Sequence, residues 1–452
     1  MFRKILIANR GDIAIRILRA CKEMGIKTVA IHSQIDSSLM HVRLADESVC
    51  IGSNRSADSY LNISAILSAA EITGADAIHP GVGFLSESEK FASIVSKNGL
   101  AFIGASPEHI SMMGDKIVAK STMSKFGIPV IKGSDGEVKT AEDAREIADK
   151  IGYPVLFKAT SGGGGKGMKV ANSPEEINDA YKMAKVEAKA NFGDDCVYME
   201  RYLAHPRHVE IQILADAYGN VVHLGERECS IQRNHQKLLE EAPSVALTDE
   251  QREKIGEIVR NAVRQLGYVG VGTLEFLYEN GEFFFMEMNT RIQVEHGISE
   301  EVSGIDLVKE QIRVAAGEKI KMQQDDIKFT GHALEFRINA ENPETFMPSP
   351  GKIEELHFPG GNGVRIDSHI YRGYVVPPYY DSLIAKVIIH APTRAECIAK
   401  ARCALDELVI DGISTTADLH RKLIRHNDVI NGNYNIHWLE NNLQNLTKGE
   451  KQ

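Results

Sequence analysis

The first third of the chain alternates short apolar runs with segments whose apolar residues recur at helical spacing. Residues 5–8 and 28–32 predict strands, and the apolar positions between residues 13 and 24 predict the helix that joins them. This strand–helix–strand order, which continues to about residue 113, is typical of a Rossmann-like α/β domain. The loop after the first strand lacks the GxGxxG fingerprint, so the fold alone does not indicate NAD binding.

A glycine-rich stretch at residues 160–167 separates two predicted strands, residues 153–159 and 168–171. Lys166 is followed by glycine and a strand, whereas a P-loop needs Ser or Thr and then a helix. We therefore expect residues 132–203 to form a mobile lid whose backbone N–H groups can cover phosphates. The alternative is a flexible surface hairpin.

The remaining pattern sets the expected domain boundaries. Capping signals begin three helices, at Thr140, at the Ser173–Glu176 box and at the Thr248–Gln251 box. The other expected elements are helices at 116–126, 304–317 and 394–408, and strands at 207–216, 221–224, 226–232, 333–339, 352–358, 364–367 and 382–390. The fold class is therefore α/β and α+β, with domains at 1–113, 114–330 and 331–446 and a polar tail at 447–452.

An aromatic-rich hairpin at residues 273–289 carries oxygen ligands inside apolar strands. Glu287 and Asn289 are two residues apart and share a face. A two-residue turn at 280–281 would pair Glu275 with Met286, on the opposite face. A three-residue loop with a glycine bulge would pair Glu275 with Glu287. Because buried carboxylates need a cation, we predict the second register with Mg²⁺ or Mn²⁺ between them; the alternative is a half-solvated hairpin.

Two further stretches concentrate groups that suit anions. In residues 228–237, Gln232, His235 and Lys237 can bond to an anion, and the last two share a face if the strand continues; the alternative is a solvated strand end. Arg291 has a planar fork suited to a carboxylate or bicarbonate, and Glu295 can act as a general base.

Three more cations are candidates for anion contacts. Arg337 lies in an apolar strand, so it is either a structural ion pair or an oxyanion stabiliser. Lys158 ends the strand before the glycines and can reach a phosphate, and Lys116 is a weaker candidate.

Composition narrows the partners and the compartment. The net charge of −10 argues against nucleic acid as the main partner. The six cysteines form no CxxC pair, which indicates reduced thiols in a cytoplasm. The N-terminal apolar run is too short for a signal peptide, and no stretch is long enough for a membrane span, so no membrane partner is expected.

Four stretches closely resemble biotin carboxylase, an ATP-grasp enzyme. They are Lys158 with residues 161–167, and residues 228–237, 285–296 and 378–382. The resemblance runs from residue 5 to the C-terminal helices. It implies an ATP-grasp fold in which ATP and bicarbonate form carboxyphosphate, which releases CO₂ to a biotin nitrogen. No biotinylation signal or carboxyltransferase-like segment follows residue 446, so biotin is expected on a separate biotin carboxyl carrier protein, with a carboxyltransferase as a further partner.

The resemblance also implies a parent enzyme and an assembly. Acetyl-CoA carboxylase of fatty acid synthesis is the commonest enzyme to contain such a chain, with pyruvate or another acyl-CoA carboxylase as alternatives. A homodimer is implied by Arg19, Glu23 and Arg365, which match the family's dimer contact.

Roles of single residues are carried over by motif match. Bicarbonate would be held by Lys237, Arg291, Gln293 and Val294. Glu295 would deprotonate it, and Arg337 would stabilise the biotin enolate. Glu275, Glu287 and Asn289 would bind the metals that bridge the phosphates. The candidate ATP contacts are Lys116, Lys158, Gly164, Gly165, Glu200, Arg201, Tyr202, Leu203, His208, Gln232 and His235, with Glu275 and Glu287 reached through the metal.

The chain departs from the family pattern at Val82, Asn234, Gly297 and Asn362, which suggests a divergent paralogue with altered acceptor contacts. Two rival functions stay open. One is an ATP-grasp ligase that joins a carboxylate to an amine. The other is a non-catalytic nucleotide-binding subunit, against which the retained Glu275, Glu287, Arg291 and Glu295 argue.

Overall fold

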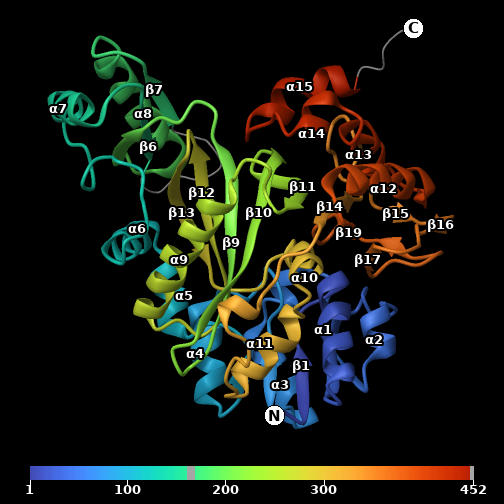
Figure 1. The fold of residues 1–452 in the computed structure, drawn as a ribbon. Helices are drawn as coiled ribbons and strands as arrows, with labels where there is room; N and C mark the ends of the chain where they lie inside the picture. Colours follow the sequence, from blue (N-terminus) through green and yellow to red (C-terminus); the bar gives the residue numbers. More distant parts are fainter. Residues whose placement is uncertain (160–167, 448–452) are drawn as a thin grey trace, which may run out of the picture.

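The computed structural model describes residues 1–159 and 168–447 and places an N-terminal α/β unit at the base of the molecule (Figure 1). Its five-stranded parallel sheet has the order β3-β2-β1-β4-β5, which confirms the Rossmann-like prediction. The strands are β1 (Lys4–Ile7), β2 (Lys27–Ser33), β3 (Glu47–Gly52), β4 (Ala77–His79) and β5 (Ala101–Phe102). The helices of this unit are α1 (Gly11–Glu23), α2 (Met40–Leu44), α3 (Ile63–Thr73), α4 (Glu89–Lys97) and α5 (Pro107–Gly114).

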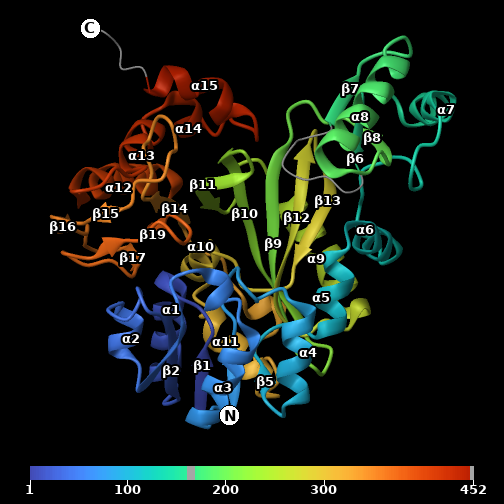
Figure 2. The same cartoon turned by 180° about the vertical axis from the view of Figure 1, so that it is seen from behind.

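The expected lid is a small sheet with two helices, to which α6 (Lys116–Lys125) leads. Views from the front and from behind both place it on one side of the central strands, with the C-terminal helices on the other (Figures 1 and 2). Its elements are β6 (Val155–Ala159), β7 (Met168–Ala171), β8 (Val197–Arg201), α7 (Ala141–Ile151) and α8 (Ile177–Phe192). The glycine-rich stretch, with Gly164 and Gly165, lies outside the described residues.

One of the three predicted caps is wrong. Thr140 and Thr248 cap α7 and α9 (Asp249–Leu266), and the Thr248 box is complete. The predicted box at Ser173 does not form, because α8 begins only after Glu176 and has no side-chain cap. The Glu176 carboxylate instead accepts hydrogen bonds from the backbone N–H and side-chain amide of Asn172, at 2.8 and 3.0 Å, and so closes the preceding turn.

An eight-stranded sheet forms the centre of the molecule and crosses the predicted boundary at residue 330. Its order is β13-β12-β9-β10-β11-β14-β19-β17, and β11 pairs antiparallel with β14 across that boundary. The strands are β9 (Arg207–Ala215), β10 (Val221–Arg233), β11 (Gln236–Ala242), β12 (Gly270–Glu279), β13 (Glu282–Asn289), β14 (His332–Asn339), β17 (Val364–Ser368) and β19 (Leu383–Ala391).

Two strand predictions are corrected. The strands expected at 221–224 and 226–232 are one strand, β10, because Gly225 takes φ 75° and shifts the register without ending the strand. The strand expected at 352–358 is two short pieces, β15 (Gly351–Lys352) and β16 (Leu356–His357), which pair in separate two-stranded sheets with β18 (Val375–Val376) and β20 (Val409–Ile410).

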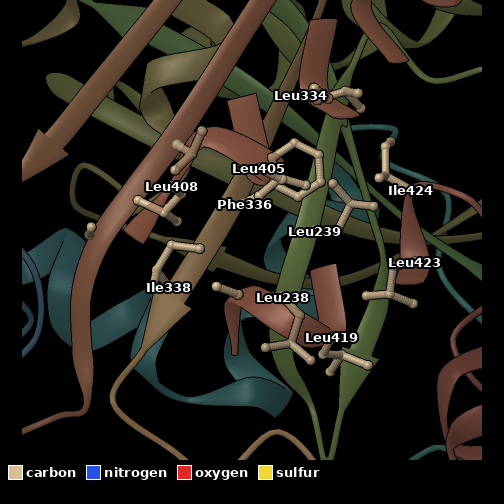
Figure 3. Close-up of a cluster of buried hydrophobic side chains, with 14 of the residues drawn as sticks. Leu238, Leu239, Leu334, Phe336, Ile338, Leu405, Leu408, Leu419, Leu423 and Ile424 are labelled. Carbon is tan, nitrogen blue, oxygen red and sulfur yellow. The ribbon is translucent and has the colours of Figure 1, made fainter. Parts of the chain in front are cut away.

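Helices cover the central sheet and bury its apolar side chains. Figure 3 shows leucines of β11 packed with Leu334, Phe336 and Ile338 of β14 against residues of α12 and α13 and their flanks. The remaining helices are α10 (His296–Ser303), α11 (Leu307–Ala315), α12 (Arg394–Glu407), α13 (Ala417–Leu423), α14 (Asn427–Asn431) and α15 (Trp438–Thr447). Within the described residues, no helix is both long and apolar enough to cross a membrane.

The β12–β13 hairpin pairs Glu275 directly with Glu287, as predicted, but by another route. The predicted three-residue loop is wrong: the turn is Asn280–Gly281, with φ of 53° and 85°, a conformation that suits a tight hairpin turn. Met286 is the extra residue of a bulge opposite Glu275 and Phe276. The bulge lets Phe285 join the hydrophobic core while Glu287 faces the other side.

Candidate active site

A cavity of about 1440 Å³ lies where the lid, the central sheet and the N-terminal unit meet. The N-terminal unit contributes residues 9–13 and 82–84 to its wall. All the candidate site residues that the structure describes line this cavity: Lys116, Lys158, Glu200, Arg201, Tyr202, Leu203, His208, Gln232, His235, Lys237, Glu275, Glu287, Asn289, Arg291, Gln293, Val294, Glu295 and Arg337. Residues that the sequence predicts for one site, although far apart along the chain, therefore lie around one cavity in the structure.

Charged side chains form a row across four adjacent strands of the central sheet. Glu287 of β13 pairs with Glu275 of β12, Glu275 with Glu210 of β9, and Glu210 with Arg227 of β10. Directly paired residues project from the same face of a sheet. Since like charges at such positions repel, this row needs added positive charge.

Arg227 supplies part of that charge from a fully buried position. Its Nε donates to Glu210 Oε1 at 2.5 Å, and its Nη2 donates to Gln293 Oε1 at 2.6 Å. Gln293 in turn donates from Nε2 to Glu275 Oε1 at 2.7 Å. Arg227 thus orients the amide that contacts the second carboxylate of the row.

Lys237 supplies a second positive charge and joins three carboxylates. Its Nζ donates to Glu210 Oε2 and Glu295 Oε1, both at 2.6 Å, and to Glu275 Oε1 at 3.1 Å. Burial alone would lower the pKa of Lys237, but the three carboxylates outweigh burial and raise it well above its usual value. Lys237 is therefore a permanent cation in the middle of the site.

The pKa values of two of these carboxylates, Glu275 and Glu295, are lowered, whereas that of Lys237 is raised. Burial alone would raise the pKa of Glu275, but Lys237 and His208 outweigh it and hold that pKa well below its usual range. Likewise Lys237 and Arg337 outweigh burial at Glu295 and keep its pKa well below normal. Both groups are therefore ionised at neutral pH.

Glu287 differs from its partner across the strand. Burial and the nearby Glu275 raise the pKa of Glu287, and the nearest cation is Lys116, whose Nζ lies 3.8 Å from Glu287 Oε2. A carboxylate pair with too little positive charge fits a divalent cation with oxygen ligands. Asn289 donates from Nδ2 to Glu275 Oε1 at 2.8 Å, while its Oδ1 accepts from Arg291 at 3.0 Å.

Arg291 and Arg337 each bridge two groups. Arg291 donates from Nε to Glu87 Oε2 at 2.8 Å, as well as to Asn289. Arg337 donates from Nε to Glu240 Oε1 at 2.6 Å and from Nη2 to Glu295 Oε2 at 2.8 Å. Arg337 therefore fits both predicted roles, a structural ion pair and an oxyanion stabiliser. Its ion pair with Glu240 holds the other end of the guanidinium at Glu295, beside the cavity.

At the lid end, Lys158 bonds to Glu200, and Lys120 Nζ lies 2.9 Å from the other oxygen of that carboxylate. Burial would raise the pKa of Glu200, but the two lysines lower it overall. The structure thus pairs Lys158 with a buried carboxylate of β8 rather than leaving it unpaired.

The hairpin between β10 and β11 corrects one expectation. The strand does not continue through His235, because Asn234 and His235 form the turn, with φ of 47° and 63°. His235 therefore lies in the turn and Lys237 on the returning strand, where Lys237 pairs with Gln232. Both still line the cavity.

Sequence reasoning missed several residues of the site. Glu210 lies in an apolar strand, the same signal that identified Glu275 and Arg337, so the pattern could have found it. Arg227 lies between Glu226 and Glu228, and Glu240 precedes Glu241, so neither stands out as a lone charge in an apolar run. Glu87 carries no such signal, because it reaches Arg291 from a loop about two hundred residues away in sequence.

Comparisons with known proteins agree with this arrangement. Residues 1–110 match the family "Biotin carboxylase, N-terminal domain", and residues 335–441 match "Biotin carboxylase C-terminal domain". Residues 115–323 match "Carbamoyl-phosphate synthase L chain, ATP binding domain".

Similar curated proteins span nearly the whole chain. Biotin carboxylase of Haemophilus influenzae is 57% identical over 444 residues, covering 98% of this chain and 99% of that protein. A pyruvate carboxylase subunit of Methanothermobacter thermautotrophicus is 50% identical over 441 residues, covering 97% of this chain and 90% of that protein.

Solved structures extend the agreement to three dimensions. A biotin carboxylase complex with a "beta-gamma-ATP" ligand from Campylobacter jejuni superposes with a TM-score of 0.91 at 49% identity, covering 98% of this chain and 99% of that one. The biotin carboxylase domain dimer of 2-oxoglutarate carboxylase from Hydrogenobacter thermophilus, solved with MgADP, ADP and bicarbonate, gives 0.90 at 47% identity, with full coverage of both chains.

Proposed function

This chain belongs to the biotin carboxylase family of ATP-grasp ligases, and we propose that it uses ATP and bicarbonate to carboxylate biotin held on a separate carrier protein. The observation that carries the proposal is the cluster in which Lys237 and Arg337 both bond to Glu295 at the cavity wall. It offers two cations for an anionic substrate around a single carboxylate that can accept a proton.

The low pKa of Glu295 makes it a weak base until an anion binds. Bicarbonate bound to Lys237 and Arg291 would draw part of their positive charge away from the carboxylates that now hold them. The proton affinity of Glu295 would then rise at the moment when bicarbonate must lose its proton. Arg337 would keep the hydrogen bond from its Nε to Glu240 and turn its Nη2 from Glu295 towards the biotin oxygen.

Glu275 and Glu287, with Asn289, would hold the metal ion, for which we propose Mg²⁺, with Mn²⁺ as the alternative. The ion would neutralise charge on the transferred phosphate. The nucleotide would be contacted by Lys116, Lys158, His208, Gln232 and His235. Its adenine would lie beside residues 200–203. Lys158 would then leave Glu200 and bind a phosphate. Lys120 would stay paired with Glu200, so that buried carboxylate would keep a cation.

For the whole enzyme, we propose a cytoplasmic acetyl-CoA carboxylase of fatty acid synthesis. In it a homodimer of this chain would work with a biotin carboxyl carrier protein and a carboxyltransferase. A second candidate is a carboxylase of a 2-keto acid, since relatives of similar identity are named for pyruvate and 2-oxoglutarate carboxylases.

The test measures ATP hydrolysis by the purified chain with bicarbonate, with and without free biotin, and carboxybiotin by its label from ¹⁴C-bicarbonate. We expect hydrolysis to need bicarbonate and to rise with biotin, and Glu295→Gln to abolish label transfer. Hydrolysis that needs an amine instead would favour the rival ligase, and no hydrolysis at all would favour a non-catalytic subunit. Reconstitution with carrier and carboxyltransferase, supplied with acetyl-CoA, pyruvate or 2-oxoglutarate, separates the two candidate enzymes.

A further inference from the structure

Behind Arg337, two carboxyl groups face each other across neighbouring strands. Glu240 of β11 and Glu335 of β14 are directly paired in the antiparallel register, and both side chains are fully buried. Directly opposed residues have their Cβ atoms about 4.5–5.5 Å apart, so their carboxyl groups are within reach of each other. Neither residue was singled out by the sequence, and the proposed chemistry uses Glu240 only as a partner of Arg337.

The hydrogen bonding of this pair is incomplete. Glu240 Oε1 accepts from Arg337 Nε at 2.6 Å. Among the described residues, Glu240 Oε2 and both oxygens of Glu335 have no hydrogen-bond partner. Two buried carboxylates so close would repel strongly if both were ionised. One proton held between them removes that repulsion and joins Glu240 Oε2 to one of the two Glu335 oxygens by a hydrogen bond.

The surrounding charges have mixed signs. Lys386 of β19 and Arg337 favour ionisation of Glu335, whereas burial, Glu240 and Glu295 oppose it. Burial has the largest effect, and the pKa of Glu335 rises to about 8 and that of Glu240 to about 7. Lys386 is itself shared, since its Nζ lies 3.7 Å from Asp12 and 3.8 Å from Asp367 and donates to the Val294 carbonyl at 2.6 Å.

Resting on the proposed function, we propose that Glu240 and Glu335 share one proton and together act as a positioning element for Arg337. With the proton in place, the pair carries a single negative charge, and Arg337 spans Glu240 and Glu295. When the proton leaves, a second negative charge appears beside Arg337 Nε. The guanidinium is then drawn towards the pair and away from Glu295 and the acceptor.

The first test is the pH profile of kcat/KM for free biotin in the full-length protein. Above the pKa of the pair, wild-type kcat/KM should fall about tenfold per pH unit, as for loss of a single essential proton. Glu335→Gln cannot ionise, yet its amide can still donate to Glu240, so this fall should disappear. Glu310→Gln, which changes a buried carboxylate of α11 beside Arg313, is the matched control and should follow the wild type.

The second test does not depend on turnover. A shared proton gives a buried carboxylic acid band in the infrared spectrum at pH 7, and this band should be present in wild type and missing from Glu335→Gln and Glu240→Gln. An unchanged band in both variants, or a Glu335→Gln pH profile that superposes on the wild type, would overturn the shared proton. If wild type showed the band but never used biotin, the proposed function would fail while the shared proton stood.

Discussion

Lys237→Gln tests the arrangement at its centre, because the Lys237 ammonium neutralises three carboxylates at once. The variant leaves Glu210 with Arg227 and Glu295 with Arg337, but Glu275 keeps only uncharged donors and His208, whose Nε2 lies 2.9 Å away. Removing one partner of a buried ion pair typically costs about 3–5 kcal/mol. We expect a loss in this range, and for a chain of 452 residues a fall in melting temperature on the order of 3–5 °C.

The pH dependence of this loss follows from the carboxylates. Lys237 holds the pKa values of Glu275 and Glu295 below normal, so its contribution is fully present above the unfolded pKa of about 4.3. It is lost as pH falls through the lower folded values. In the variant the two carboxylates can take up protons, so the difference from wild type should be complete at pH 7 and should shrink below about pH 5.

Thermal and urea denaturation at pH 7 and pH 4 measure both effects. Lys321→Gln is the control, because its exposed ammonium lies 3.9 Å from Glu318 and such pairs contribute about 0–1 kcal/mol. A loss at pH 7 no larger than that of the control would refute the central role of Lys237. So would a large loss that stays the same at both pH values.

Three further changes test other parts of the structure. Glu287→Gln should remove the rise in melting temperature that Mg²⁺ gives the wild type, and a rise of equal size would exclude Glu287 as a ligand. Arg337→Lys cannot bridge Glu240 and Glu295, so biotin-dependent turnover should fall about tenfold or more while the KM for ATP stays unchanged. Gly281→Ala places a side chain at φ 85° and should cost about 1–2 kcal/mol in urea denaturation without changing kcat.

Most of the local structure could be predicted because it follows from the spacing of apolar residues. The capped helix at Thr248 and the parallel N-terminal sheet are such cases. The chemistry was predictable where a charge interrupts an apolar strand, as at Glu275 and Arg337, since burial of an unpaired charge is too costly to be accidental.

The parts that could not be predicted depend on contacts or on backbone irregularities. Met286 resembles its apolar neighbours, so nothing in the sequence distinguishes a bulge there from a three-residue turn, although both pair Glu275 with Glu287. Gly225 likewise shifts the register within β10, where two separate strands were expected. The pairing of β11 with β14 joins segments about a hundred residues apart, and only tertiary packing selects it.

The charge balance also links the two anionic substrates. In the structure Lys237 is fully engaged by carboxylates, so it can bind bicarbonate only if one of them finds another cation. Glu275 is the one that can, because it faces Glu287 at the proposed metal position. A metal ion that arrives with ATP would therefore release Lys237 for bicarbonate. Nucleotide would strengthen bicarbonate binding without any contact between the two ligands, and by thermodynamic linkage bicarbonate would strengthen nucleotide binding equally.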